Sequence, residues 1–173
     1  KFYPLGSILV WKTDLKLHKH RSIGGHEIDD PSFNRTEYQY LLDGQQRTTS
    51  LLTSLYGGKI ESQPGFDPTL YIDLTVTNID ETDDESYKRR FLYHEEIDTR
   101  AGELLRNQPR EKRYQEGLII KLSDIKHNFN GVQERIVNHP EVKADYNHPY
   151  WIELRRVQQV LDNYRISFIE LKG

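Results

Sequence analysis

The pattern of apolar and polar positions divides the chain into short strands and amphipathic helices. Runs or alternations of branched and aromatic residues predict strands at 6–11, 38–42, 70–74 and 165–171. Residues 51–56 and 151–164 instead place their apolar side chains on one face of a helix. Gly57 and Gly58 follow the first of these segments and predict its end, because glycine accepts a left-handed backbone. Strands alternating with helices predict an α/β or α+β fold.

The segments between these elements are less regular. Residues 14–37 are polar and contain Gly24-Gly25, so we expect a flexible loop or insertion, and we expect it to act as a lid over a site. Residues 77–86 are acidic and predict a surface loop. Residues 90–93 fit either a strand or part of a helix from 86 to 106. Residues 118–122 are apolar, and Ser123 is predicted to cap a short helix that follows them.

Composition narrows the class of protein. A length of 173 residues suits a single domain over 1–173, and because the chain lacks methionine even at position 1, we expect it to be a fragment of a longer protein. The net charge of -3 argues against a uniformly basic nucleic-acid binder. Cysteine is absent, which excludes disulfides and fits a reducing compartment, so we expect a cytoplasmic protein. No apolar run approaches the length that spans a membrane.

The most distinctive stretch is a polar turn, Asp43-Gly44-Gln45-Gln46-Arg47-Thr48-Thr49, between a predicted strand and a predicted helix. The first N–H groups of a helix have no internal partner, and the helix dipole favours an anion there. Gly44 lets a ligand approach the backbone, and Arg47 offers a fork of donors that matches phosphate oxygens. Thr48 and Thr49 add hydroxyl groups. These features are those of a phosphate site at a helix N-terminus, although strand–turn–helix junctions with polar caps are also common without one.

The remaining residues of the turn suit roles other than binding phosphate. The whole turn also has a purely structural interpretation. Gln45 and Gln46 are neutral amides, suited to orienting a water, a base or a ribose, whereas Asp43 suits a metal-bound water or a ribose hydroxyl. In the structural alternative Asp43 caps the helix, Arg47 pairs with an acidic neighbour and the glutamines are solvated. The turn is not a P-loop, because Gly-x4-Gly-Lys-Ser/Thr is missing.

The ten residues from Asp43 to Leu52 closely resemble the signature of the GmrSD-type family, the N-terminal domains of modification-dependent restriction enzymes. Residues 2–8, 118–125 and 164–169 resemble further segments of that family. The resemblance implies a fold similar to the ParB/sulfiredoxin type, a small mixed sheet flanked by helices. It also implies a domain that binds and hydrolyses a nucleoside triphosphate with Mg²⁺, in a protein that restricts modified DNA.

Site residues and partners follow from the same resemblance. Its catalytic positions fall on Asp43, Gln45, Gln46 and Arg47, and its nucleotide-binding positions fall on Gly44, Arg47, Thr48 and Thr49. Arg47 would contact phosphate, one glutamine would position water or base, and Mg²⁺ would neutralise the leaving phosphate, with no protein metal ligand assigned. The partners are DNA, through the full-length protein, and a C-terminal nuclease domain or subunit. Two segments typical of the family, one before the first strand and one after the last, are missing here, so part of the nucleotide site is expected outside these residues.

Two other interpretations stay open. The turn could contact DNA backbone or a modified base without turnover, or the chain could be a structural fragment whose site is incomplete. His18 and His20 are expected to be solvated loop residues rather than metal ligands. The pairs Arg89-Arg90, Lys112-Arg113 and Arg155-Arg156 would either line a path for DNA or, as we expect, lie on solvated faces.

Overall fold

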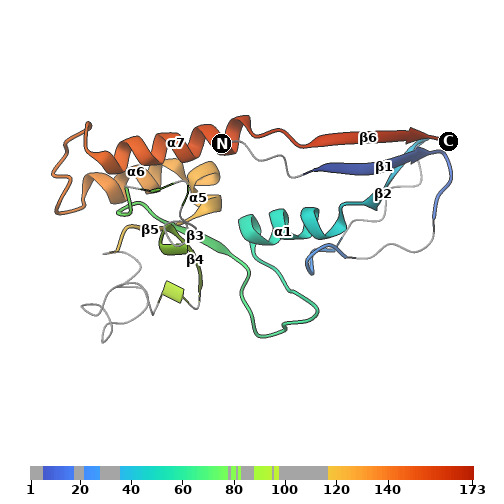
Figure 1. Ribbon diagram of the computed structural model, residues 1–173, viewed down its shortest axis with the longest axis horizontal. Coiled ribbons are helices and arrows are strands. Elements are labelled where there is room, and N and C mark those ends of the chain that lie inside the picture. Colours follow the sequence, from blue (N-terminus) through green and yellow to red (C-terminus); the bar gives the residue numbers. More distant parts are fainter. Residues whose placement is uncertain are drawn as a thin grey trace.

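A computed structural model describes residues 6–17, 22–27, 36–77, 79–80, 82, 88–94, 96–97 and 117–173. Its elements, in chain order, are β1 (Ser7–Thr13), β2 (Tyr38–Asp43), α1 (Gln45–Tyr56), β3 (Leu70–Asp73), β4 (Phe91–Tyr93), β5 (Ile119–Lys121), α5 (Leu122–His127), α6 (Phe129–Val137), α7 (Pro149–Asn163) and β6 (Ser167–Lys172). They form an elongated α+β molecule with two separate three-stranded sheets (Figure 1). None of the helices in these ranges is long and apolar enough to span a membrane.

The first sheet has the order β2-β1-β6, so the first strand of the chain lies in its middle. β1 pairs with β2 in antiparallel fashion and with β6 in parallel fashion, with Ser7 opposite Ser167. Residues 167–172 of β6 are all exposed, including Phe168 with 65% of its surface. In β1, Ile8 and Thr13 are buried and the residues between them are half-buried. This sheet therefore contributes little to the core.

The second sheet, of order β4-β3-β5, is antiparallel throughout and packs against α5, α6 and α7 (Figure 1). Its inner side chains join those of the helices in the larger apolar cluster, which includes Ile72, Ile120, Ile125, Ile136 and Leu154. All five are exposed by 1% or less. The hydrophobic core therefore lies in this half of the molecule.

Several sequence predictions are confirmed. The strands predicted at 6–11, 38–42, 70–74 and 165–171 correspond to β1, β2, β3 and β6, and the two amphipathic helices correspond to α1 and α7. Gly57, with φ 72°, ends α1 as expected. Residues 91–93 form a strand, because Leu92 pairs with Tyr71 of β3. Most of 77–86, and most of the alternative helix 86–106, lie outside the described residues.

One local prediction is wrong, and one helix was not predicted. Ser123 does not cap α5, because the helix begins directly after β5 at Leu122 and Lys121 occupies the N-cap position. No element was predicted at residues 129–137, where α6 lies, and Asn130 and Gly131 in this segment are weak helix formers. Val132 and Ile136 nevertheless lie one helical turn apart and are both buried in the core. Tertiary packing thus overrides a weak local preference.

Candidate functional site: the turn between β2 and α1

The turn at residues 43–47 is formed by an irregular strand end that leads directly into a helix. The pairing with β1 shifts between Leu9, opposite Asp43, and Val10, opposite Leu41, so Leu42 is an extra residue in β2. Such a bulge bends a strand and redirects the side chains that follow it. Asp43 ends β2, Gly44 is the N-cap residue, and α1 begins at Gln45. Gln45, Gln46 and Arg47 therefore belong to the first turn of the helix.

Gly44 is required by this geometry. Its φ of 94° and ψ of 13° lie in the left-handed region, and a Cβ atom there would be 3.2 Å from Cγ1 of Ile8. The Gly44 carbonyl accepts the first helical hydrogen bond from the N–H of Thr48, at 2.9 Å. Asp43 does not cap α1, so that part of the structural alternative is wrong: the N-cap is Gly44, and no side-chain bond caps the helix there. The first N–H groups of α1 are thus available to an anion.

Arg47 is held beside this helix start by two contacts. Its Nη1 donates a hydrogen bond to the carbonyl oxygen of Ser7 in β1, and its Nη2 lies 3.8 Å from Oδ2 of Asp43. The guanidinium also lies over Gly6, where a Cβ atom would come within 3.4 Å of Cζ. Its side chain is still 39% exposed. Arg47 therefore pairs with an acidic neighbour, as the structural alternative expected, while it presents an oriented cation to solvent.

The other residues of the turn are divided between solvent and the protein. Gln45 and Gln46 are exposed, and the Asp43 side chain is 68% exposed. The Thr48 hydroxyl is buried and has no hydrogen-bond partner within the described parts of the chain. Thr49 is half-buried, and its methyl group lies near Gly24. The structure thus brings Asp43 and Arg47 together and leaves Gln45 and Gln46 exposed in the same helical turn, whereas Thr49 lies near a neighbouring loop.

The donor set of the turn fits a magnesium–phosphate complex. Mg²⁺ in nucleotide sites is commonly held by one or two carboxylates together with substrate phosphates and water. Asp43 supplies one exposed carboxylate beside the helix start. Across the described ranges there is no group of three or more His, Asp or Glu side chains that could hold a metal ion without a ligand. A metal at this turn would therefore depend on the phosphate it accompanies.

Part of the predicted loop 14–37 packs against α1. Residues 22–27 form a small turn closed by Ile23 and His26. Nε2 of His26 is 2.8 Å from the Gly57 carbonyl oxygen, and the Lys59 N–H donates to the Gly24 carbonyl, also at 2.8 Å. These contacts lie at the C-terminal end of α1, away from Gly44. The lid role of the loop stays a prediction.

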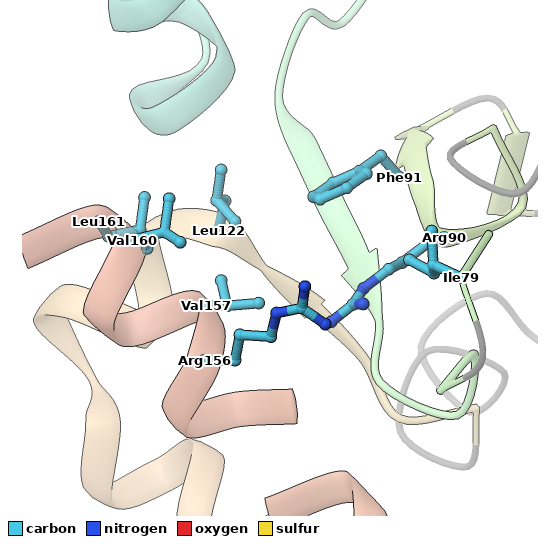
Figure 2. A pocket seen from close by; sticks show the side chains of 8 residues that line it. All are labelled: Ile79, Arg90, Phe91, Leu122, Arg156, Val157, Val160 and Leu161. Atoms are coloured by element: carbon cyan, nitrogen blue, oxygen red, sulfur yellow. The ribbon is translucent and has the colours of Figure 1, made fainter. Parts of the chain in front are cut away.

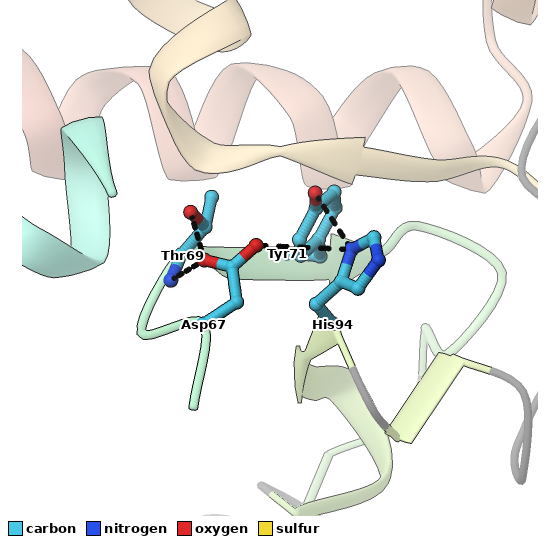
Figure 3. A network of polar contacts seen from close by, with 4 residues as sticks. All are labelled: Asp67, Thr69, Tyr71 and His94. Atoms are coloured by element: carbon cyan, nitrogen blue, oxygen red, sulfur yellow. Dashed lines mark hydrogen bonds and ion pairs between the residues drawn. The ribbon is translucent and has the colours of Figure 1, made fainter. Parts of the chain in front are cut away.

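A second polar cluster joins the loop before β3 to the end of β4 (Figure 3). Oδ1 of Asp67 accepts hydrogen bonds from the Thr69 hydroxyl and N–H, while Nδ1 of His94 lies 3.3 Å from the Tyr71 hydroxyl and 4.0 Å from Oδ2 of Asp67. Partial burial opposes ionisation of Asp67, but the bonds from Thr69 and the charges of His94 and Lys121 outweigh it and lower its pKa. Asp73 with Thr75 and Asp80 with Thr82 repeat the same two bonds. The recurrence identifies a turn motif, so we interpret the cluster as structural.

The structure contradicts the prediction for one of the basic pairs, Arg89-Arg90. Arg90, expected on a solvated face, is only 4% exposed, and its Nη2 is 2.5 Å from Oε2 of Glu153 on α7. That expectation is wrong because the partner comes from a helix far along the chain. The sequence did contain a signal at the partner residue, because Glu153 lies among Tyr150, Trp151 and Leu154, which are all buried. Arg155 and Arg156 are exposed, as predicted.

The comparisons with known proteins agree with the resemblance of the turn. The family model described as "GmrSD restriction endonuclease, N-terminal domain" matches residues 1–172. No curated protein matches the chain. The family match includes both sheets, the turn at residues 43–47 and the core helices. The chain therefore belongs to the family of GmrSD restriction endonuclease N-terminal domains.

Proposed function

We propose that the chain is a nucleoside-triphosphate-binding and hydrolysing domain of a DNA restriction protein, with the phosphates bound at the start of α1. The observation that carries this proposal is the position of Arg47. The Ser7 carbonyl holds its guanidinium beside the N-terminus of α1, where Gly44 is the N-cap residue and no side chain caps the helix. An oriented arginine next to unpaired helical N–H groups is a favourable arrangement for phosphate oxygens.

Each exposed residue of the turn has a role in this proposal. The N–H groups at the start of α1 and the Arg47 guanidinium bind the phosphate oxygens. Asp43 lies close enough to orient Arg47 and to hold water in the shell of a magnesium ion, which would supply charge neutralisation at the leaving phosphate. Gln45 or Gln46 orients the attacking water through its amide. The hydroxyl groups of Thr48 and Thr49, which the resemblance assigns to nucleotide binding, are less accessible, because the Thr48 hydroxyl is buried and Thr49 is half-buried.

A second candidate function is DNA contact without turnover. The exposed amides of Gln45 and Gln46 favour it, because amides also form bonds to base edges. Such binding would weaken with salt and would not require nucleotide. In either case the nuclease activity of a restriction system would reside in a partner domain or subunit.

The deciding experiment compares ligand-induced thermal shifts of the wild type, Arg47→Ala and Arg155→Ala with each ribonucleoside triphosphate and Mg²⁺. Arg155 is an exposed arginine on α7 and serves as the matched control. A nucleotide at a hundred times its Kd is expected to add about 2.7 kcal/mol to the wild type and the control, but little to Arg47→Ala. Release of inorganic phosphate by the wild type would then establish hydrolysis.

Other outcomes contradict the proposal. If a nucleotide stabilises all three proteins equally, it binds elsewhere. If no nucleotide stabilises the wild type, while a short duplex DNA does so in a salt-dependent way that Arg47→Ala abolishes, the turn serves DNA instead.

A further inference from the structure

A cavity and a strand of the described structure leave apolar side chains without full cover. The cavity, of about 230 Å³, lies between α7, α5 and β4, and its wall includes Phe91 and Val157 (Figure 2). Both side chains are half-buried in a confined space. The strand is β6, in which Phe168, Ile169 and Leu171 are 65%, 51% and 45% exposed. β6 is therefore the less protected of these two surfaces.

β6 also forms one edge of the first sheet, and among the described strands it pairs with β1 alone. Its register with β1 is one to one, from Ser7 opposite Ser167 to Lys12 opposite Lys172. The opposite edge, β2, is interrupted by its bulge, and the edge strands of the second sheet, β4 and β5, have three residues each. Bulges and short edge strands hinder pairing with another chain, whereas a long regular edge favours it. β6 is thus the edge best suited to receive a further strand.

The backbone pairing of β6 determines which of its groups are open to an added strand. The N–H of Gly173 donates to the carbonyl oxygen of Lys12, at 3.2 Å. Because successive residues of a strand direct their N–H and C=O groups to opposite edges, those of residues 167, 169 and 171 also point toward β1. The N–H and C=O groups of residues 168, 170 and 172 therefore point away from the sheet.

A second copy of β6 can pair with the first in few registers. In an antiparallel pair, residues with outward groups must lie opposite one another to exchange hydrogen bonds. With Glu170 opposite Glu170, like charges meet directly, which is unfavourable. With Ile169 opposite Ile169, each carboxylate of Glu170 lies opposite the apolar ring of Phe168. With Leu171 opposite Leu171, each Glu170 instead lies opposite Lys172, so this register matches opposite charges twice.

We propose that β6 is a dimerisation edge, which pairs in antiparallel fashion with β6 of a second copy of this chain, with the two Leu171 residues opposite each other on the two-fold axis. Glu170 and Lys172 lie 4.0 Å apart within one copy, so four alternating charges meet at the interface. The two three-stranded sheets join edge to edge, and Ile169 and Leu171 of both copies lie on the same face of the joined sheet. This proposal does not depend on nucleotide binding at the turn.

The overall arrangement of the chain is compatible with this pairing. α7 precedes β6, and the C-terminus lies at the other end of the strand (Figure 1). Because the axis passes through Leu171, near that end, the two copies of α7 lie at opposite ends of the joined sheet.

Cysteine cross-linking tests the register, because the chain itself contains no cysteine. Residues opposite each other in a non-hydrogen-bonded antiparallel pair have Cα atoms about 4.5 Å apart, within the range that a disulfide bridges. Only a residue on the two-fold axis lies opposite its own copy. The variants are Leu171→Cys, Ile169→Cys and, as the matched control, Phe168→Cys, which replaces the most exposed of the three side chains. Each is oxidised mildly and analysed by non-reducing electrophoresis.

Charge reversal with analytical ultracentrifugation tests the complementarity. Lys172→Glu turns two opposite-charge pairs into like-charge pairs and should weaken dimerisation about tenfold. The double variant Glu170→Lys/Lys172→Glu should restore it. Lys126→Glu, which makes the same change of charge at an exposed position on α5, is the control and should dimerise like the wild type. Circular dichroism confirms that each variant is folded.

The proposal predicts concentration-dependent dimers of the wild type and a disulfide-linked dimer of Leu171→Cys, with little cross-linking of Ile169→Cys or Phe168→Cys. A wild type that stays monomeric at every concentration would overturn it. So would cross-linking of Ile169→Cys or Phe168→Cys as efficient as that of Leu171→Cys, or a double variant that dimerises no better than Lys172→Glu.

Discussion

At the scale of single residues, Gly44 determines whether the turn can form. Its backbone is left-handed, and a Cβ atom would meet Ile8. We predict that Gly44→Ala lowers the free energy of unfolding by about 1–3 kcal/mol, because it adds both backbone strain and a steric contact. Gly65→Ala is the control, since nothing lies within 4 Å of a Cβ atom at that position. Urea denaturation measures both, and equal effects would contradict the argument.

Tyr150 provides a residue-scale prediction about pH. Burial, together with the hydrogen bond that its hydroxyl donates to Glu141, raises its pKa from 10.0 to about 12. Between pH 10 and about pH 12 the unfolded chain loses the Tyr150 proton while the folded chain keeps it. The raised pKa therefore contributes its full stabilisation below pH 10, and this contribution declines as the pH rises toward 12. Stability should therefore fall more steeply above pH 10 in the wild type than in Tyr150→Phe, as measured by denaturation at a series of alkaline pH values. Parallel curves would show that Tyr150 makes no such contribution.

The sequence shows which polar residues lie in the turn, but it does not show which groups hold them in place. An arginine, a glycine and an acid beside a predicted helix indicate an anion site from composition and order alone. The acceptor that orients Arg47 is the backbone carbonyl of Ser7, and a carbonyl leaves no mark in a sequence. The burial of Arg90 was missed for a different reason, because its partner Glu153 is 63 positions away in the sequence.

At the scale of elements, the pair between Arg90 and Glu153 joins α7 to the start of β4. Both side chains are at least 91% buried, so loss of one leaves a buried charge without its partner. We predict that Glu153→Ala costs about 3–5 kcal/mol of stability. The double variant Arg90→Met/Glu153→Leu should lose less than Glu153→Ala, because no charge then remains buried.

Glu134→Ala is the control for this pair, since Glu134 is exposed on α6, and it should change stability by no more than about 0.5 kcal/mol. Chemical denaturation of the three variants would test the argument. A double variant less stable than Glu153→Ala would show that the unpaired charge of Arg90 is not the main cost of that substitution.

Most elements with a regular spacing of apolar residues were predictable from the sequence, whereas those defined by pairing with a neighbour were not. α7 shows its apolar stripe in the sequence, and β1 is a short branched run. Residues 90–93 carried no decisive period, and only pairing with β3 makes part of them a strand. α6 carries apolar residues at helical spacing, namely Phe129, Val132, Ile136 and Val137, so the sequence held a signal from which no helix was predicted.

At the scale of the whole molecule, the two sheets differ in how well they are buried. Both apolar clusters consist of residues from β3, β4, β5 and the segments and helices around them, whereas β6 is exposed along its length. The Tyr56 hydroxyl, 3.1 Å from Nε2 of His127, is one of the contacts between α1 and α5 that connect the halves. Local stability follows buried apolar contact. The first sheet should therefore open at a lower free energy than the second.

Amide hydrogen exchange tests this difference. We predict that amides of β1 that bond to β2 and β6 exchange through a partial opening that leaves the amides of β3 and β5 protected. Equal protection of both sheets, with exchange only by global unfolding, would contradict this prediction. A nucleotide bound at the turn should raise the protection of β1, because Arg47 is bonded to Ser7.

The pairing of Ser7 with Ser167 also has a consequence for synthesis on the ribosome. The carbonyl that orients Arg47 belongs to the first strand, and that strand completes its sheet only when residues 167–172 have left the exit tunnel. Until then, β2 is the only one of the described strands that can pair with β1, and a two-stranded hairpin is marginal in water. Arg47 would thus be synthesised long before the strand that orients it belongs to a stable sheet. Premature termination before residue 167 would yield a protein that contains residues 43–47 but lacks the complete sheet that holds Arg47 in place.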